Sequence, residues 1–113
     1  MTPILANAFQ TEISLSAAAY ANQDLDMAFH HLERAHILGQ RDFSAHLKTH
    51  GGMLKIGIVR RDVREIVGQI MRIIAVFPAS LFGWVPIGNT GGANVSALKS
   101  MKIPDDLAVY FED

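Results

Sequence analysis

The 113-residue chain has a formal net charge of −1, and 50% of its residues are apolar. This composition excludes an intrinsically disordered chain and suits one domain with a single hydrophobic core. Without cysteine there are no disulfide bonds, thiolate nucleophiles or cysteine-based zinc sites, and we expect a cytoplasmic location. The uncharged run 73–98 contains Pro78 and Pro86, so we expect no membrane span. Few aromatic residues accompany the bases of the middle of the chain, so nucleic acid is not favoured as a partner.

Two helices are predicted in the first third of the chain. Thr2 and Pro3 have the pattern of an N-cap followed by proline at the first helical position. Asp24 follows a turn and is the expected N-cap of the second helix, which Gly39 would end in the left-handed conformation. Apolar residues recur at helical spacing in the first helix: Phe9, Ile13, Ala17 and Tyr20.

A third and a fourth helix are predicted between residues 42 and 77. Glycines 51 and 52 leave open whether the third helix, over 42–59, is broken there. Asp62 and Glu65 resemble a capping box for the fourth helix, which Pro78 is expected to end. Its apolar stripe is expected to be buried: Val63, Ile66, Val67, Ile70, Ile74 and Phe77.

Residues 79–113 are predicted to form an irregular strap with a short terminal helix over 104–111. The segment 88–94 lacks the Gly-Lys-Ser/Thr sequence of a phosphate loop, so a turn whose Asn and Thr side chains satisfy buried backbone groups is favoured. Apolar residues of the strap, among them Trp84, Ile87 and Leu98, either anchor it on the helices or form an exposed patch. The chain is therefore expected to be one all-α domain, a small bundle of about four helices (1–78) followed by the strap (79–113).

All five histidines fall between residues 30 and 50. If the chain folds back at Gln40 as an antiparallel hairpin, His36 lies level with His46, and Glu33 lies level with His50. Imidazoles and a carboxylate that converge from two helices suit a divalent transition metal such as zinc. We therefore predict a metal site made of Glu33, His36, His46 and His50. Glu12, His30 and His31 are candidates for additional ligands, and the alternative is a set of ordinary packing histidines without metal.

Three sequence blocks carry a resemblance to a known family. They are HLERAHILGQ, the following H-x-x-x-H, and PIGNTGGANVSALK. Together they resemble the bacterial domain-of-unknown-function family 3703 over nearly the whole chain. The resemblance implies a compact protein of about this length, and it supplies no catalytic residues to carry over.

Three functions remain open from the sequence, and we rank a metal- or small-ligand-binding protein first. A protein-interaction or oligomerisation module without metal is second. A metal-dependent enzyme is third, because its only catalytic groups would be a metal-bound water with Glu33 or Glu12 as base. The uncharged stretch 73–98 also predicts self-association, as a homodimer, because a small core cannot hide so much apolar surface.

Overall fold

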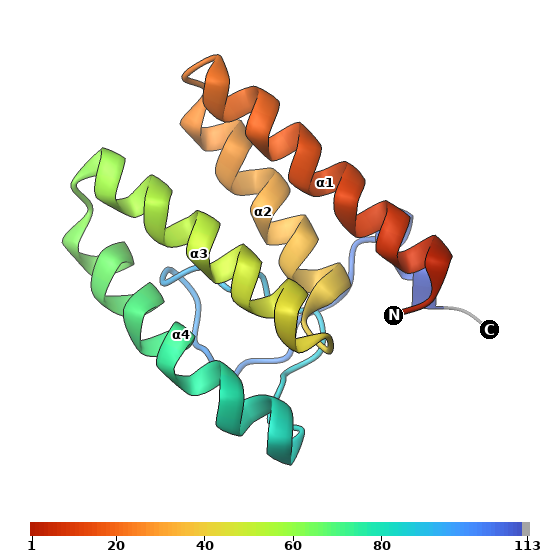
Figure 1. Cartoon of the computed structure of the whole chain (residues 1–113). Helices are drawn as coiled ribbons and strands as arrows, with labels where there is room; N and C mark the ends of the chain where they lie inside the picture. Colours follow the sequence, from red (N-terminus) through yellow and green to blue (C-terminus); the bar gives the residue numbers. More distant parts are fainter. Residues whose placement is uncertain (112–113) are drawn as a thin grey trace.

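The computed structural model describes residues 1–111, apart from the side chain of Ser80. No strand occurs in this range, and none of its helices is long and apolar enough to cross a membrane. The predicted all-α class is confirmed. The elements in chain order are α1 (Pro3–Ala21), α2 (Leu25–Gly39), α3 (Phe43–Arg60), α4 (Val63–Phe82), α5 (Asp105–Ala108) and the 3₁₀ turn η1 (Val109–Phe111) (Figure 1).

Each of the four long helices begins at a side-chain cap. An oxygen of Thr2, Asp24, Asp42 or Asp62 accepts a hydrogen bond from the backbone N–H three residues later. Such a bond satisfies one of the free donors of the first helical turn. The predicted starts of these helices are therefore confirmed.

Two helices run further than the sequence indicated. The α3 helix continues through Gly51 and Gly52 without a break, and α4 continues past Pro78 to Phe82. The prediction that Pro78 ends the helix is wrong. Proline removes one backbone hydrogen bond, to the carbonyl of Ile74, and that residue lies on the solvent side of the helix, where water can replace the lost donor. The helix ends instead at Gly83, which has the left-handed φ of 70°.

Gly39 has a different role from the predicted one. It is the last helical residue of α2 and does not adopt a positive φ. A Cβ atom at this position would lie 2.8 Å from the Cβ of Ala45 and 2.9 Å from the ring of Phe9. Glycine therefore serves here to let α1 and α3 approach the end of α2.

The helices lie side by side in the order of the sequence. The α1 helix packs on α2, α2 on α3, and α3 on α4, which leaves α4 at one edge of the row (Figure 1). The two clusters of buried apolar residues lie among α1, α2, α3 and α5, and one of them contains both Leu107 of α5 and Phe9 of α1. Neither cluster contains a residue of α4.

The side of α4 that faces the protein is not the predicted one. Five residues of the stripe expected to be buried are 45–72% exposed: Val63, Val67, Ile70, Ile74 and Phe77. The helix instead buries Gln69 and Val76. This side faces the strap, whose backbone carbonyls need donors: Gln69 Nε2 donates to Gly91 O at 3.0 Å and Arg72 Nη2 to Val95 O at 2.9 Å. The hydrogen bonds to these carbonyls therefore stabilise α4 in this orientation.

The strap, which begins at Gly83 in the structure, is held by Asn89. The buried Asn89 amide donates to Ser96 O at 2.8 Å and Lys99 O at 2.6 Å, and its Oδ1 accepts from Gly91 N at 2.8 Å. The prediction that polar side chains satisfy the backbone of this segment is confirmed for Asn89. The apolar residues proposed as anchors include three that are largely exposed: Trp84, Ile87 and Leu98.

Candidate metal centre

Three of the predicted ligands meet at one end of the α2–α3 hairpin. His36 lies in the last turn of α2, and His46 and His50 lie in the first two turns of α3. Only three residues separate the two helices, so the predicted closure near Gln40 is confirmed. All three side chains are buried.

The ring nitrogens of these histidines converge. One potential ligand atom from each lies within 4.8 Å of the others, and the ring centroids are 4.8–4.9 Å apart in all three pairs. The Nε2 atoms of His46 and His50 are 3.0 Å apart. Two imidazoles bound tetrahedrally to zinc at about 2.0–2.1 Å place their nitrogens about 3.3 Å apart. The pair is therefore within a few tenths of an ångström of the geometry that a metal requires.

Two of the imidazoles have their protonation fixed by partners behind them. His36 Nδ1 is 2.6 Å from the carbonyl of Asn89, which can only accept, so this nitrogen carries the proton. The amide nitrogen of Gln69 donates to Glu65 Oε2 and to Gly91 O, so its Oε1 accepts from His50 Nδ1 at 2.7 Å. Both histidines consequently keep a lone pair on Nε2. Partners of this kind orient metal-binding histidines in proteins.

His46 differs from the other two. Its Nδ1 is buried and has no hydrogen-bond partner among the residues that the structure describes. Its Nε2 faces the lone pair of His50 Nε2. This contact between the two Nε2 atoms is therefore the one hydrogen bond that can fix the tautomer of His46 among the described residues. A cation between the two Nε2 atoms would use both lone pairs at once.

Burial keeps the cluster uncharged. It lowers the pKa of His46 to about 4, and burial together with the nearby His46 lowers the pKa of His50 to about 4. The pKa of His36 is well below its ordinary value, first because of burial and then because of repulsion from His50 and His46. Neutral imidazole is the form that binds metals, so at neutral pH no proton has to leave before a metal enters.

Gly91 of the strap lies against the His36 ring. Its φ is +86°, and a Cβ atom there would lie 2.6–2.9 Å from three atoms of the imidazole. Both the backbone conformation and the space therefore require glycine. The strap thus covers the cluster on the side of the His36 ring.

The profile of a family described as a protein of unknown function, DUF3703, matches residues 4–111. The chain belongs to this family. The resemblance carried by the histidine and glycine-rich blocks is therefore confirmed. No curated protein and no solved structure matches the chain.

The DUF3703 match covers all the predicted ligands, but the structure separates Glu33 from the histidines. Among the described residues, the groups with metal-binding geometry include only the three histidines. Glu33 lines a different pocket together with Glu65, and its pKa is raised by burial and then by the charge of Glu65. Pairing by depth along the two helices did not settle which face each side chain occupies: Glu33 lies beside Glu65, whereas His36 lies against Asn89 and Gly91 of the strap.

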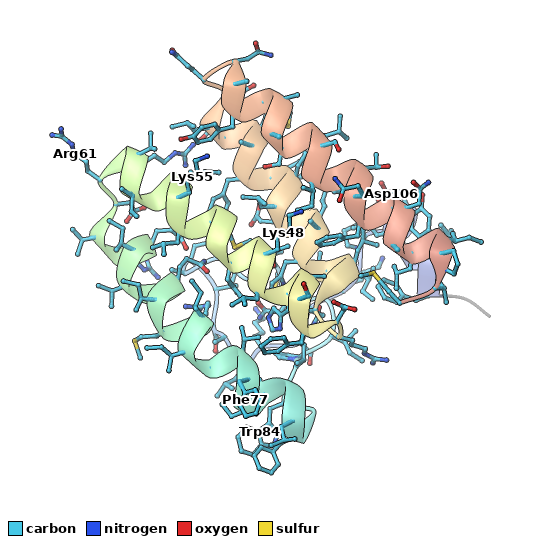
Figure 2. The ribbon with its side chains drawn as sticks, in the orientation of Figure 1. Lys48, Lys55, Arg61, Phe77, Trp84 and Asp106 are labelled. Atoms are coloured by element: carbon cyan, nitrogen blue, oxygen red, sulfur yellow. The ribbon has the colours of Figure 1, made fainter. Side chains whose placement is uncertain are left out.

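The other candidate ligands have partners elsewhere. Glu12 accepts from His31 Nδ1 at 2.8 Å and from Arg34 Nε at 2.7 Å. Arg34 also bonds Asp106 of α5, which Figure 2 shows beside α1. His30 is exposed. The ion pairs of Glu12 and Arg34 tie α1, α2 and α5 together, and neither these groups nor His30 belong to the three-histidine cluster.

Gln69 and Asn89 support the cluster, and sequence reasoning assigned neither of them to it. Gln69 is fully buried on α4 and donates to Glu65. In the sequence, the only indication of this hydrogen bond is that the two residues are four positions apart on one helix. Asn89 lies in the glycine-rich block already singled out, but its contact with His36 spans 53 positions of the chain. Long-range pairings of this kind leave no periodic pattern in a sequence.

Proposed function

We propose that this protein binds one divalent transition metal ion through His36, His46 and His50. The observation that carries the proposal is the convergence of three buried, neutral imidazoles from two helices. Two of them are already oriented by hydrogen bonds to Asn89 and Gln69. Zinc is the preferred candidate, since it commonly takes imidazole ligands in tetrahedral geometry.

Three protein ligands leave a fourth tetrahedral position for water or another small ligand. This pattern is typical of zinc sites that exchange a ligand, whereas structural zinc sites have four protein ligands. A cavity of about 210 Å³ adjoins the three histidines and provides space for that ligand. The site therefore favours the binding of a metal together with a small molecule.

Metal analysis of protein purified without a histidine tag tests this proposal directly. We expect one zinc ion per chain, and a titration of the metal-free protein should show a single site. His46→Ala should weaken zinc binding at least about tenfold, because the ring provides one of only three protein ligands.

Two variants serve as controls for this titration. His30→Ala removes an exposed histidine of α2, and Glu33→Gln removes the carboxylate that the sequence placed in the site. Both should leave the affinity for zinc unchanged. Absence of zinc binding by the parent, or equal binding by His46→Ala and His30→Ala, would refute the metal site.

A second proposal concerns self-association, which the surface of α4 favours. Six exposed apolar residues follow one another at alternating spacings of four and three: Val63, Val67, Ile70, Ile74, Phe77 and Leu81. We call this row the α4 seam. Such alternation is the pattern that two helices bury between them in a coiled coil. A second copy of the chain, which presents the same seam, is the partner that we propose.

A further inference from the structure

The cavity beside the three histidines has mostly apolar walls. Alanine and valine side chains of α4 form one wall, including Val76 and Ala79, and Val85, Pro86 and Leu98 of the strap contribute the other. Its volume of about 210 Å³ exceeds that of engineered cavities of about 150 Å³ that bind benzene. A compact ligand of one ring or a short branched chain therefore fits beside the metal ligands.

With a divalent metal bound, the cavity would have an excess of positive charge, which favours an anionic ligand. Three neutral imidazoles do not compensate a divalent ion, and the metal-binding group contains no carboxylate among the described residues. A buried positive charge without a counter-charge is costly in a low-dielectric site. The ligand at the fourth position is therefore expected to bring a negative charge with it.

Arg72 of α4 adds a second positive charge to the lining. Its Nη1 donates to Gly68 O at 3.1 Å and its Nη2 to Val95 O at 2.9 Å, so two of its five N–H donors are occupied by uncharged carbonyls. Within residues 1–111 the Arg72 guanidinium has no ion-pair partner at 4.0 Å or less. Burial lowers the pKa of Arg72, and the charge of Glu65 offsets only part of this lowering. A guanidinium in this situation favours an anion in the cavity.

We infer that the site binds a small monocarboxylic acid with a compact apolar body. A carboxylate oxygen takes the open position of the metal, the charge of Arg72 favours the anion, and the body lies against the apolar walls of the cavity. This inference rests on the metal centre proposed above. It adds the chemical class of the molecule that completes that centre.

The experiment uses the full chain loaded with Co²⁺, whose visible absorption reports changes in its ligands. The cobalt content is measured first and tests the metal centre alone. Benzoate is then added to the loaded protein, with acetate and benzyl alcohol as comparisons. We expect benzoate to change the cobalt spectrum and to bind at least about tenfold more tightly than acetate, which lacks the apolar body, and than benzyl alcohol, which lacks the charge.

Three variants separate the parts of this inference. Arg72→Met should weaken benzoate at least about tenfold. Ala79→Leu, which fills the cavity, should also weaken benzoate while the chain still takes up cobalt. Arg64→Met removes an exposed arginine from the same helix and should leave benzoate binding unchanged.

The outcomes distinguish the two proposals. Stoichiometric cobalt with no spectral response to benzoate, or with acetate bound as tightly as benzoate, overturns the ligand class and leaves the metal centre standing. Failure of the parent to bind cobalt overturns both. Weaker benzoate binding in Arg72→Met and Ala79→Leu, but not in Arg64→Met, supports the cavity and its charge as the binding site.

Discussion

Single side chains decide the chemistry of the histidine cluster. His36 and His50 are buried, uncharged and hydrogen-bonded through the nitrogen that points away from the cluster. Each remaining nitrogen keeps its lone pair, and burial rather than a charged partner is the main reason that no proton occupies it. These properties explain why the cluster suits a metal and why it also affects stability when no metal is bound.

The first residue-scale prediction is a pH dependence of the metal-free protein. His46 has a pKa of about 4 in the folded chain and about 6.5 when unfolded. Between these values the unfolded chain binds a proton that the folded chain does not, so the free energy of unfolding falls as pH is lowered from 6.5 to 4. Above about pH 6.5 this contribution is complete and constant. Urea denaturation measures this free energy of unfolding at each pH. Between pH 7 and pH 4.5, the free energy of unfolding of His46→Gln should fall by roughly 2 kcal/mol less than that of the parent.

His36 and His50 are present in both proteins, but in His46→Gln they no longer feel the repulsion that His46 adds to the lowering of their pKa values. This change also reduces the acid loss of stability in the variant, so it acts in the same direction as the loss of His46 itself. An equal loss of stability in the two proteins would show that His46 remains accessible to protons in the folded state.

Gly91→Ala is the second residue-scale prediction. The added methyl group needs the positive φ of 86° and the space of the His36 ring, so we expect a loss of about 1–3 kcal/mol in the free energy of unfolding. Displacement of His36 should also weaken zinc binding at least about tenfold. Gly51→Ala is the control, because its Cβ meets nothing within 4 Å and alanine in a helix stabilises by about 0.5–1 kcal/mol. Urea denaturation and zinc titration check both variants, and unchanged zinc affinity in Gly91→Ala would contradict the contact.

At the scale of whole elements, the sequence predicted the helices well because their signals are local. Caps such as Thr2 and Asp62 bond a backbone group three residues away, so spacing alone reveals them. The meeting of His36 on α2 with the His46 and His50 pair on α3 was predictable for the same reason, once a short hairpin was inferred. Glu33 shows the limit of that reasoning. Equal distance from the turn at Gln40 indicates which residues of the two helices lie at the same depth, but not which helix face each side chain occupies.

The orientation of α4 could not be predicted from the same signals. An apolar stripe is identical in sequence whether it is buried within the chain or against another molecule. Its orientation depends on Gln69 and Arg72, which donate to carbonyls of the strap more than twenty positions away. The path of the strap depends on these hydrogen bonds between residues far apart along the chain, and no periodic pattern in the sequence reveals such bonds.

At the scale of the whole molecule, the described residues form a row of helices in which α4 lies at one edge, with α3 as its neighbouring helix and the strap against its buried side. Its outer surface combines the α4 seam with Met71, Phe82 and Trp84, each at least 60% exposed. Figure 2 shows Phe77 and Trp84 projecting from the end of this helix. If each of these nine side chains buries about 100 Å², each copy contributes on the order of 900 Å², close to the roughly 800 Å² per partner of a standard interface. The surface is therefore large enough for a dimer.

Ile74→Lys tests this dimer at the centre of the α4 seam. Ile74 is 72% exposed, so a lysine there leaves the fold of the single chain intact but would place two charges in a twofold-symmetric apolar interface. Light scattering should give the parent twice the single-chain mass of 12.4 kDa and the variant the single-chain mass. Ile4→Lys is the matched control, since Ile4 is 71% exposed but lies on α1, and it should remain dimeric. A parent that stays monomeric across a wide concentration range, or an Ile74→Lys variant as dimeric as Ile4→Lys, would exclude the α4 seam as the interface.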